Sequence, residues 1–342
     1  MVTSDIDIVI LWVDGNDPKL ISEKQRYSAG RESFFADVNR QRDWGIFRYV
    51  FRGVEAYLPW VRRIYLVTSF GQCPPWLNVT HDRLRIVDVE EFMPSEVLPT
   101  FNSNSIQLCI HKLPGLSERF ILWDDDMFAI SPMKPDDFFH GGLPCTQIGF
   151  ARLTAERYDD TYAHSILNDV GVINQNFDFR VQLRKWWRKW LSLRNGIDVL
   201  LRNVGYIGPM DRFFWAYYPH MPQGYLRKTF EDIWYVEHDI MGQAITHRFR
   251  SKEDLTHKLM RYWQIASGEV VPRNTRSYGR LFLNFPEEIE ALRRVVYRSS
   301  KKLVCINDSN VSESMFEYCC EEIKNILNYR LPDMSAYEKL DD

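Results

Sequence analysis

The chain has 342 residues, which fits one large or two ordinary domains. Hydrophobic residues make up 45% and charged residues 26%, a composition that is typical of a globular protein and argues against disorder. The net charge is -3, with 43 basic and 46 acidic residues. A general nucleic-acid-binding protein needs a broad basic surface, so we expect no nucleic-acid partner.

The cysteines and the hydropathy pattern bear on the compartment. The six cysteines include no CxxC pair and are too sparse for a disulfide scaffold, which predicts reduced thiols. No apolar run approaches the roughly 20 residues that span a bilayer. The first residues also lack the form of a signal peptide. We therefore expect a cytoplasmic protein that is soluble or, at most, peripheral on a membrane.

The first half of the chain alternates predicted strands and helices. Residues 6–13 (IDIVILWV) are a near-continuous apolar run typical of a buried central strand, and the run ends at the turn-forming segment 14–18. Further strands are predicted over 64–68, 84–89 and 119–123, and helices over 45–58 and 103–112. The alternation predicts an α/β fold with a mostly parallel, Rossmann-like sheet and helices on both faces.

The second half has a mainly helical pattern. Helices are predicted over 177–192, 224–244, 252–266, 287–298 and 312–328, and a short strand over 303–306. No repeat or low-complexity linker divides the chain, so we expect a single domain over 1–342. Within it we expect an α/β region (residues 1–150), an inserted, mainly helical lobe (residues 151–275) and a C-terminal region that returns to the core (residues 276–342).

Acidic segments follow two of the predicted strands, at residues 14–17 and at Asp124, Asp125 and Asp126. Ligands of parallel sheets bind outside the carboxyl ends of the strands, so these segments predict a site. Carboxylates on a tight turn suit Mg²⁺ or Mn²⁺, and in an extended stretch Asp124 and Asp126 face the same way. The alternative is an acidic helix cap or a solvated turn.

Asp7 interrupts an otherwise apolar strand. Because burying a charge is costly, this carboxylate must be paired, bound to metal or placed at the strand's solvent end. The solvent end is the commonest of these outcomes.

A histidine and two arginines in the second half are further candidates. His220 lies between Pro219 and Pro222, in a segment that cannot be helical, and a fixed imidazole suits a general base. Arg248 and Arg250 stand at a predicted helix junction, where a guanidinium could bind a phosphate with two hydrogen bonds. An exposed histidine and ordinary salt bridges to Glu253 or Asp254 are the alternatives.

Residues 180–194 (RVQLRKWWRKWLSLR) predict an amphipathic basic helix. One stripe holds Leu183, Trp186, Trp187, Trp190 and Leu191, and basic residues fill the other face. Such a helix suits contact with an anionic membrane surface. The alternative is a helix that docks on the core through its tryptophans.

Taken together, the sequence blocks resemble the Stealth family of sugar-1-phosphate transferases, whose bacterial members assemble phosphodiester-linked surface polysaccharides. The matching blocks are 6–17 (IDIVILWVDGND), a second region from 42 to 128, PHMP at 219–222 with HRFRSKED at 247–254, and CIND at 305–308. The family often has Asn where this chain has Asp124 and Glu where it has Gln107. The resemblance implies a glycosyltransferase-A-like sheet in which residues 1–150 bind a nucleotide sugar.

The resemblance also implies residue roles. Asp7, Asp126, His220 and Arg250 are expected to be catalytic, and Mg²⁺ or Mn²⁺ is expected on Asp125, Asp126 and Asp308. The nucleotide sugar is expected to contact Asp14, Gly15, Asn16, Asp17, Arg48, Asn102, Ser103 and Arg248.

The implied reaction moves a hexose-1-phosphate or N-acetylhexosamine-1-phosphate from a UDP-sugar to a hydroxyl of a lipid-linked or oligosaccharide acceptor, with release of UMP. His220 or Asp126 would act as the base. One alternative is a metal-dependent glycosyltransferase that releases UDP, and another is a non-catalytic carbohydrate-binding protein, which only the abundance of aromatic residues favours.

Overall fold

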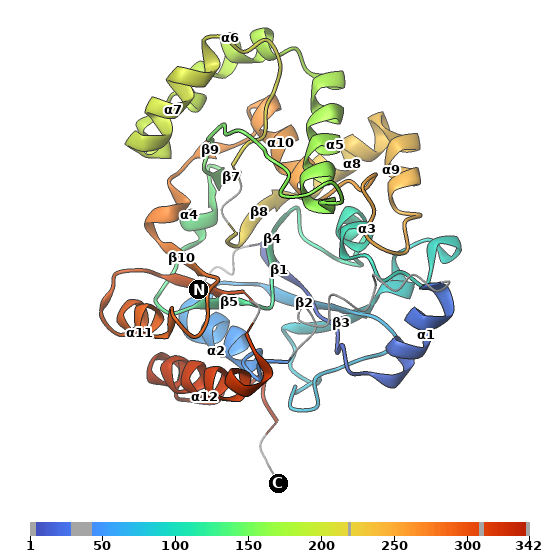
Figure 1. The fold of residues 1–342 in the computed structure, drawn as a ribbon, viewed down its shortest axis with the longest axis vertical. Coiled ribbons are helices and arrows are strands. Elements are labelled where there is room, and N and C mark those ends of the chain that lie inside the picture. The colour runs from blue at the N-terminus through green and yellow to red at the C-terminus, as the bar shows by residue number, and fades with distance from the viewer. Residues whose placement is uncertain (1–4, 29–42, 218–219, 308–310, 340–342) are drawn as a thin grey trace.

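The fold is built on one central sheet (Figure 1). The computed structural model describes residues 5–28, 43–217, 220–307 and 311–339. The strands follow the order β3-β2-β1-β4-β8. Four are parallel: β1 (Ile6–Leu11), β2 (Arg63–Thr68), β3 (Leu84–Asp88) and β4 (Arg119–Trp123); β8 (Gln223–Leu226) is antiparallel to β4. The prediction of an α/β fold with a mostly parallel, Rossmann-like sheet is confirmed.

Two three-stranded sheets flank the central one. The first joins β10 (Gly279–Phe282), β11 (Leu303–Ile306) and β5 (Met127–Ala129). The second joins β6 (Phe139–His140), β7 (Leu143–Thr146) and β9 (Val271–Pro272). The β5–β11 pair returns the C-terminal region of the chain to the residues that directly follow β4.

Helices cover both faces of the central sheet (Figure 1). The α-helices of the described residues are α1 (Pro18–Ser28), α2 (Arg48–Tyr57), α3 (Ser103–Leu108), α4 (Pro135–Phe138), α5 (Thr161–Asn176), α6 (Phe179–Trp190), α7 (Ile197–Ile207), α8 (Arg227–Val236), α9 (His238–Ala244), α10 (Lys258–Ser267), α11 (Ile289–Arg298) and α12 (Glu313–Arg330). Figure 1 shows α2, α11 and α12 together on one side, and α5 to α7 gathered at one end of the long axis.

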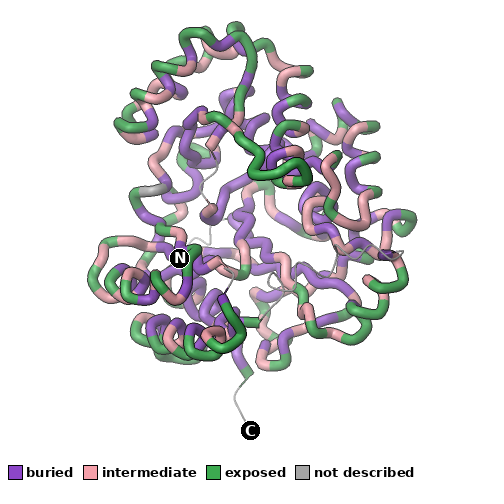
Figure 2. Tube along the Cα trace, in the orientation of Figure 1, coloured by how far each residue is buried: buried purple, intermediate pink, exposed green. Residues whose placement is uncertain are grey.

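Side chains alternate along β1 between two hydrophobic cores. Ile6, Ile8 and Ile10 belong to the core that α2, α11 and α12 complete, whereas Val9 belongs to the core beneath α8 to α10. This is the period of two that a pleated strand imposes. Figure 2 shows the central strands buried and exposed residues spread over the outer helices.

The sequence-based predictions were wrong in places. Residues 223–226 form strand β8, so the helix predicted over 224–244 begins only at Arg227 and is broken at Glu237 into α8 and α9. The helix predicted over 252–266 begins at Lys258. Helices α1, α5 and α7 were not predicted, because their apolar faces are short or interrupted by polar residues.

Candidate functional site

The acidic turn after β4 meets His220 because β8 runs antiparallel to β4. Leu122 pairs with Gln223, so the chain just before β8 lies beside the residues just after β4. His220 Nε2 is 3.1 Å from Asp126 Oδ2, and His220 Nδ1 is 3.8 Å from Asp124 Oδ2. Asp124 and Asp126 therefore face the same way, as their alternation predicted. The sheet register alone brings together groups almost a hundred residues apart.

The two carboxylate oxygens of Asp126 differ in their hydrogen-bond partners. Its Oδ2 atom also accepts a hydrogen bond from Cys305 Sγ at 3.1 Å, because Cys305 pairs with Met127 across β11 and β5. Its Oδ1 atom is buried and has no hydrogen-bond partner among the described residues. A buried carboxylate oxygen without a partner is costly, so this atom indicates a place for a cation or a donor from a ligand.

Ligand atoms of Asp126, His220 and Cys305 lie within 4.8 Å of one another, so these residues form a possible metal site. Burial and the neighbouring carboxylates hold the pKa of the Cys305 thiol well above its usual value, which disfavours the thiolate that a metal prefers. Oxygen ligands from the acidic turn fit Mg²⁺ or Mn²⁺ better. Asp125 lies in the same turn with an exposed side chain, and Asp308 lies outside the described residues.

Burial and the neighbouring charges have opposing effects on the pKa values of His220 and Asp124. Burial lowers the pKa of His220, but the hydrogen bond to Asp126 and the charges of Asp126 and Asp124 outweigh burial and raise this pKa to about 9. Burial raises the pKa of Asp124, and Asp126 adds to that rise, whereas His220 and more distant cations oppose it. In the absence of ligand, His220 is therefore a cation paired with Asp126 at neutral pH.

Lys258 is a site residue that the sequence analysis missed. Its side chain is buried at the first position of α10, and its charge acts on both Asp124 and Asp169. Burial lowers the pKa of Lys258 to about 8 against the attraction of those two carboxylates. The sequence offered only a weak signal, namely a lysine that begins the segment KLMRYWQIAS. Lysine side chains are seldom fully buried, so the structure was needed to single out this one.

The loop that carries Arg250 is fixed by the segment that begins α3. Arg250 Nη2 donates to Ser103 Oγ at 3.1 Å, and the charge of Arg250 is among those that lower the pKa of Asp124. The exposed guanidinium therefore lies at the margin of the acidic turn. Asn102 is buried, and its amide donates to the carbonyl oxygens of His247 and Phe249 and to Asp254. The geometry gives Asn102 a structural role, and its role in substrate binding stays a prediction.

Arg248 has a structural role as well. Its Nη1 atom donates to the carbonyl oxygens of Pro99 at 2.6 Å and Val97 at 3.3 Å, and its guanidinium covers the ring of Tyr27. These contacts bind the loop to the segment before α3. The predicted contact of Arg248 with the substrate stays a prediction, and the structure shows its Nη1 atom bound to protein carbonyls.

Asp7 lies far from the acidic turn. It is fully buried near the start of β1, four residues before the carboxyl end of that strand, or about 13 Å. Arg62 Nε donates to Oδ1 at 2.8 Å, and Ser117 donates to Oδ2 from both its amide and its hydroxyl. Asp7 is thus paired rather than at a solvent end. Its part in catalysis stays a prediction, and the contacts seen here are structural.

The turn after β1 is held by its own acids and by Gln72. Asp14 Oδ1 accepts from the amide of Asn16, and Asp17 Oδ1 accepts from the amide of Leu20 at the start of α1. Gln72 Oε1 accepts from the amide of Asp14. This fixes the turn 14–17 at the carboxyl end of β1, where a nucleotide is expected, but shows no ligand contact.

The side chain of Arg48 lies against Glu338 and Trp76. Its Nη1 atom lies 3.9 Å from a carboxylate oxygen of Glu338, and its guanidinium covers the ring of Trp76. The predicted contact of Arg48 with the nucleotide therefore gains no support.

A shallow hollow lies at the carboxyl ends of β2 and β3. It is lined by Ser69, Phe70, Val89, Glu90, Leu98, Pro99 and Thr100. The rings of Phe70 and Phe101 stack with centroids 6.2 Å apart, and Lys19 approaches the ring of Phe70. A planar ring beside a cation suits the stacking of a nucleobase and the binding of its phosphates. The sequence analysis singled out neither Phe70 nor Lys19.

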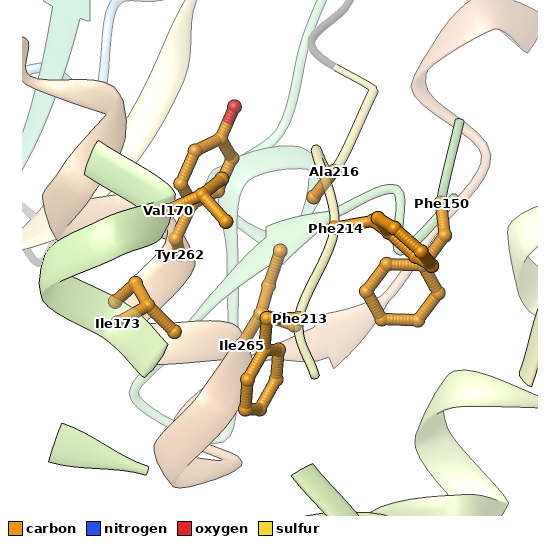
Figure 3. Close-up of a pocket in the computed structure, with 8 residues that line it drawn as sticks. All are labelled: Phe150, Val170, Ile173, Phe213, Phe214, Ala216, Tyr262 and Ile265. Atoms are coloured by element: carbon orange, nitrogen blue, oxygen red, sulfur yellow. The ribbon is translucent and has the colours of Figure 1, made fainter. Parts of the chain in front are cut away.

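A small apolar cavity lies away from these residues, in the lobe formed by α5, α10 and the segment before β8 (Figure 3). Its walls are Phe150, Val170, Ile173, Phe213, Phe214, Ala216, Tyr262 and Ile265. None of these side chains is charged, so the cavity offers no group that would bind a diphosphate.

The sequence matches two conserved regions of one family: "Stealth protein CR1, conserved region 1" over residues 4–32 and "Stealth protein CR2, conserved region 2" over residues 40–145. It is also 34% identical to the exopolysaccharide phosphotransferase cps2G of Lactiplantibacillus plantarum, over 98% of this chain and 96% of that protein. The chain belongs to the Stealth family. The prediction that it is a transferase is confirmed.

Two further relatives align over a similar share of the chain. The receptor polysaccharide phosphotransferase WefC of Streptococcus gordonii is 35% identical over 97% of this chain and 98% of its own length. The capsular polysaccharide phosphotransferase WcwK of Streptococcus pneumoniae is 32% identical over 98% of both chains. Because the alignments span nearly the whole chain, the family relationship extends beyond the two matched conserved regions.

Among solved structures, the galactosyltransferase LgtC in complex with donor and acceptor sugar analogues matches 96% of this chain and 98% of its own, with a TM-score of 0.38 and 9% identity. Within the described residues, no helix is both long and apolar enough to cross a membrane. All six cysteines are free thiols, as predicted.

Proposed function

We propose that this Stealth protein transfers a hexose-1-phosphate or N-acetylhexosamine-1-phosphate from a UDP-sugar to a hydroxyl of a lipid-linked or oligosaccharide acceptor, in the synthesis of a capsular or other surface polysaccharide. The names of its full-length relatives support phosphotransfer. The observation that carries the proposal is the paired His220 and Asp126 beside the buried, unpartnered Oδ1 atom of Asp126.

The reaction forms one bond and breaks one. The acceptor oxygen bonds to the sugar-proximal phosphorus, and the bond from that phosphorus to the bridging oxygen breaks. The bridging oxygen leaves on UMP, and the acceptor proton passes to a base. Such chemistry depends on alignment and on the neutralisation of charge more than on covalent help, so cationic groups around an acidic turn are the features that it requires.

His220 Nε2 is our candidate for the atom that takes the acceptor proton. This role needs a neutral imidazole, whereas the hydrogen bond and charge of Asp126 raise the pKa of His220 to about 9. A cation held by Asp126 would lower this pKa, because it would offset the carboxylate charge that stabilises the protonated imidazole. Asp126 Oδ2 is the alternative acceptor for the proton, since it lies only 3.1 Å from the same ring nitrogen.

Asp126 and Asp124 are best placed to hold Mg²⁺ or Mn²⁺, with Asp125 and Asp308 as further candidates. A divalent cation there would offset the charge of these carboxylates and of the donor diphosphate. Arg250 would bind phosphate oxygens as their charge grows in the transition state. Lys258, behind Asp124, adds a positive charge that the protein itself supplies.

The test is to incubate the purified protein with a panel of UDP-sugars, Mg²⁺ or Mn²⁺ and acceptor glycans, and then to separate the nucleotide products. We expect UMP that depends on the acceptor, together with a phosphodiester signal in phosphorus NMR. Acceptor-dependent UDP would instead mean that a glycosidic bond had formed, and the proposal would be abandoned.

A further inference from the structure

The amphipathic helix predicted over 180–194 uses its tryptophan stripe to dock on the protein. Trp190 is fully buried and donates from Nε1 to the carbonyl oxygen of Ile265, at the end of α10. Trp186 packs against Gly268, and Lys189 Nζ donates to the carbonyl oxygen of the same glycine at 2.6 Å. The alternative of a helix docked through its tryptophans is confirmed. Only part of the stripe is used in this way, because Trp187 is 50% exposed.

The neighbouring helix nevertheless leaves an apolar face uncovered. Within α7, Val199, Asn203 and Ile207 are buried on one side. Leu193, Ile197, Leu201 and Val204 are exposed by 69%, 68%, 68% and 57%. Residues spaced by three or four lie on one side of a helix, so Ile197, Leu201 and Val204 form a continuous stripe that points away from the core. Figure 2 shows this end of the molecule largely exposed.

The segment that carries this stripe is strongly basic. The α6–α7 segment, residues 179–208, holds seven basic residues and one acidic residue, although the whole chain has a net charge of -3. Arg180, Arg184, Lys185, Arg188 and Arg194 are exposed. Arg180 Nη2 donates to the carbonyl oxygen of Gly208, which places the start of α6 beside the end of α7. Trp187 is also half exposed on α6, so apolar and basic side chains share this surface.

We propose that the α6–α7 segment is a docking surface for an anionic lipid membrane. Aliphatic side chains on α7 and the ring of Trp187 would enter the headgroup region, and the arginines and Lys185 would meet lipid phosphates. An exposed apolar stripe in a segment with seven basic residues and one acidic residue favours this occupant over a neutral protein partner, because the net charge complements an anionic surface.

Docking through this segment would hold the reaction near the membrane surface. The end of α10 anchors α6, and the first residue of α10 is Lys258, beside the acidic turn. The ten residues of α10 span about 15 Å. The inference goes beyond the proposed reaction, and its test needs neither donor nor acceptor.

The test measures co-sedimentation of the full chain with vesicles of phosphatidylcholine, with and without phosphatidylglycerol. We expect binding to the anionic vesicles that weakens as salt rises. The variant Arg184→Glu with Arg188→Glu should lower the partition coefficient at least about tenfold. Its matched control is Arg294→Glu with Arg298→Glu, an exposed pair with the same spacing on α11, which should change binding less than about twofold.

A second pair of variants tests the apolar stripe. Leu201→Ser with Val204→Ser should also lower binding about tenfold, whereas Tyr235→Ser with Val236→Ser, exposed at the end of α8, should leave it unchanged. Thermal melts confirm that each variant is folded. The proposal is overturned if the wild type ignores anionic lipid, or if the α6–α7 variants bind like their controls. Dimers that only Leu201→Ser with Val204→Ser dissociates, without lipid binding, would assign the stripe to a second copy and also overturn it.

Discussion

His220 Nε2 lies 3.1 Å from Asp126 Oδ2, although 94 positions separate the two residues in the sequence. The antiparallel pairing of β8 with β4 makes the contact, because it sets the chain before one strand against the chain after the other. The contact brings together two sequence blocks that resemble the Stealth family, because Asp126 lies in the block 42–128 and His220 in the block 219–222. It also leaves His220 protonated at neutral pH, with a pKa of about 9.

Replacing His220 with Asn should lower kcat by about 10²–10⁴, because the transfer loses the group that handles the acceptor proton. The variant should remain folded with a lower melting temperature, since it loses the ion pair of His220 with Asp126. The matched control is His238→Asn, because His238 is an exposed histidine at the start of α9. Steady-state kinetics with UMP as the readout make the comparison. Full activity in a folded His220→Asn protein would remove this residue from the mechanism.

Arg250 and Arg248 are close in sequence, but replacing each with Ala should have different effects on kcat and on the melting temperature. Arg250→Ala should lower kcat strongly and leave the melting temperature nearly unchanged, because its guanidinium is exposed and lies at the margin of the acidic turn. Arg248→Ala should lower the melting temperature, because carbonyl oxygens of Val97 and Pro99 lose their donor. Kinetics and thermal melts on both variants separate the two roles. The reverse pattern would exchange our assignments.

How far the sequence predicted this arrangement depends on the element. The strand over 119–123 was predicted to the residue, because a buried parallel strand is a short apolar run between polar turns. Strand β8 was missed, since Gln223-Gly224-Tyr225-Leu226 has no apolar alternation and leads directly into α8. Without β8, no local pattern could show which acid His220 would meet. The unpartnered Oδ1 atom of Asp126 is likewise a property of the packed structure alone.

The Asp7→Asn variant separates structural from catalytic importance. It removes the charge that pairs with Arg62, and we expect the free energy of unfolding to fall by about 1.5–3 kcal/mol, as for lost hydrogen bonds to a charged group. The folded fraction should keep its kcat, because Asp7 lies at the amino-terminal end of β1. Urea unfolding and kinetics below the transition measure the two effects. A lost kcat at unchanged stability would return Asp7 to the catalytic residues.

Removal of metal should stop turnover, and a structural readout can separate this loss from other effects of a chelator. After treatment with EDTA, added Mn²⁺ should raise the melting temperature of the wild type, because a ligand that binds only the folded state stabilises it by about 2.7 kcal/mol at 100 times its Kd. The Asp126→Asn protein should show little of this rise. Asp211→Asn, an exposed acid before β8, serves as the control and should respond like the wild type. Equal stabilisation of all three proteins would place the cation elsewhere.

The Arg52–Glu338 ion pair should make stability depend on pH. Arg52 Nε and Nη2 donate to the two carboxylate oxygens of Glu338 at 2.7 and 2.8 Å, and both side chains are buried. Burial raises the pKa of Glu338, but the hydrogen bonds and charge of Arg52 outweigh burial and hold this pKa below its usual value of 4.5. The unfolded state therefore takes up its proton first as the pH falls. The stabilisation is complete well above pH 4.5 and is lost as the pH drops through the lowered pKa.

Glu338→Gln tests this linkage. Breaking a buried pair leaves Arg52 without its anion, so the variant should lose about 3–5 kcal/mol of unfolding free energy at pH 7. Because the wild type loses the same interaction in acid, the difference between the two proteins should shrink steadily below pH 4.5. Glu321→Gln, at an exposed position of α12, should match the wild type at every pH. Urea titrations across this range provide the measurement. A difference that stays constant down to pH 3 would mean that the carboxylate charge of Glu338 is not what holds the C-terminal segment to α2.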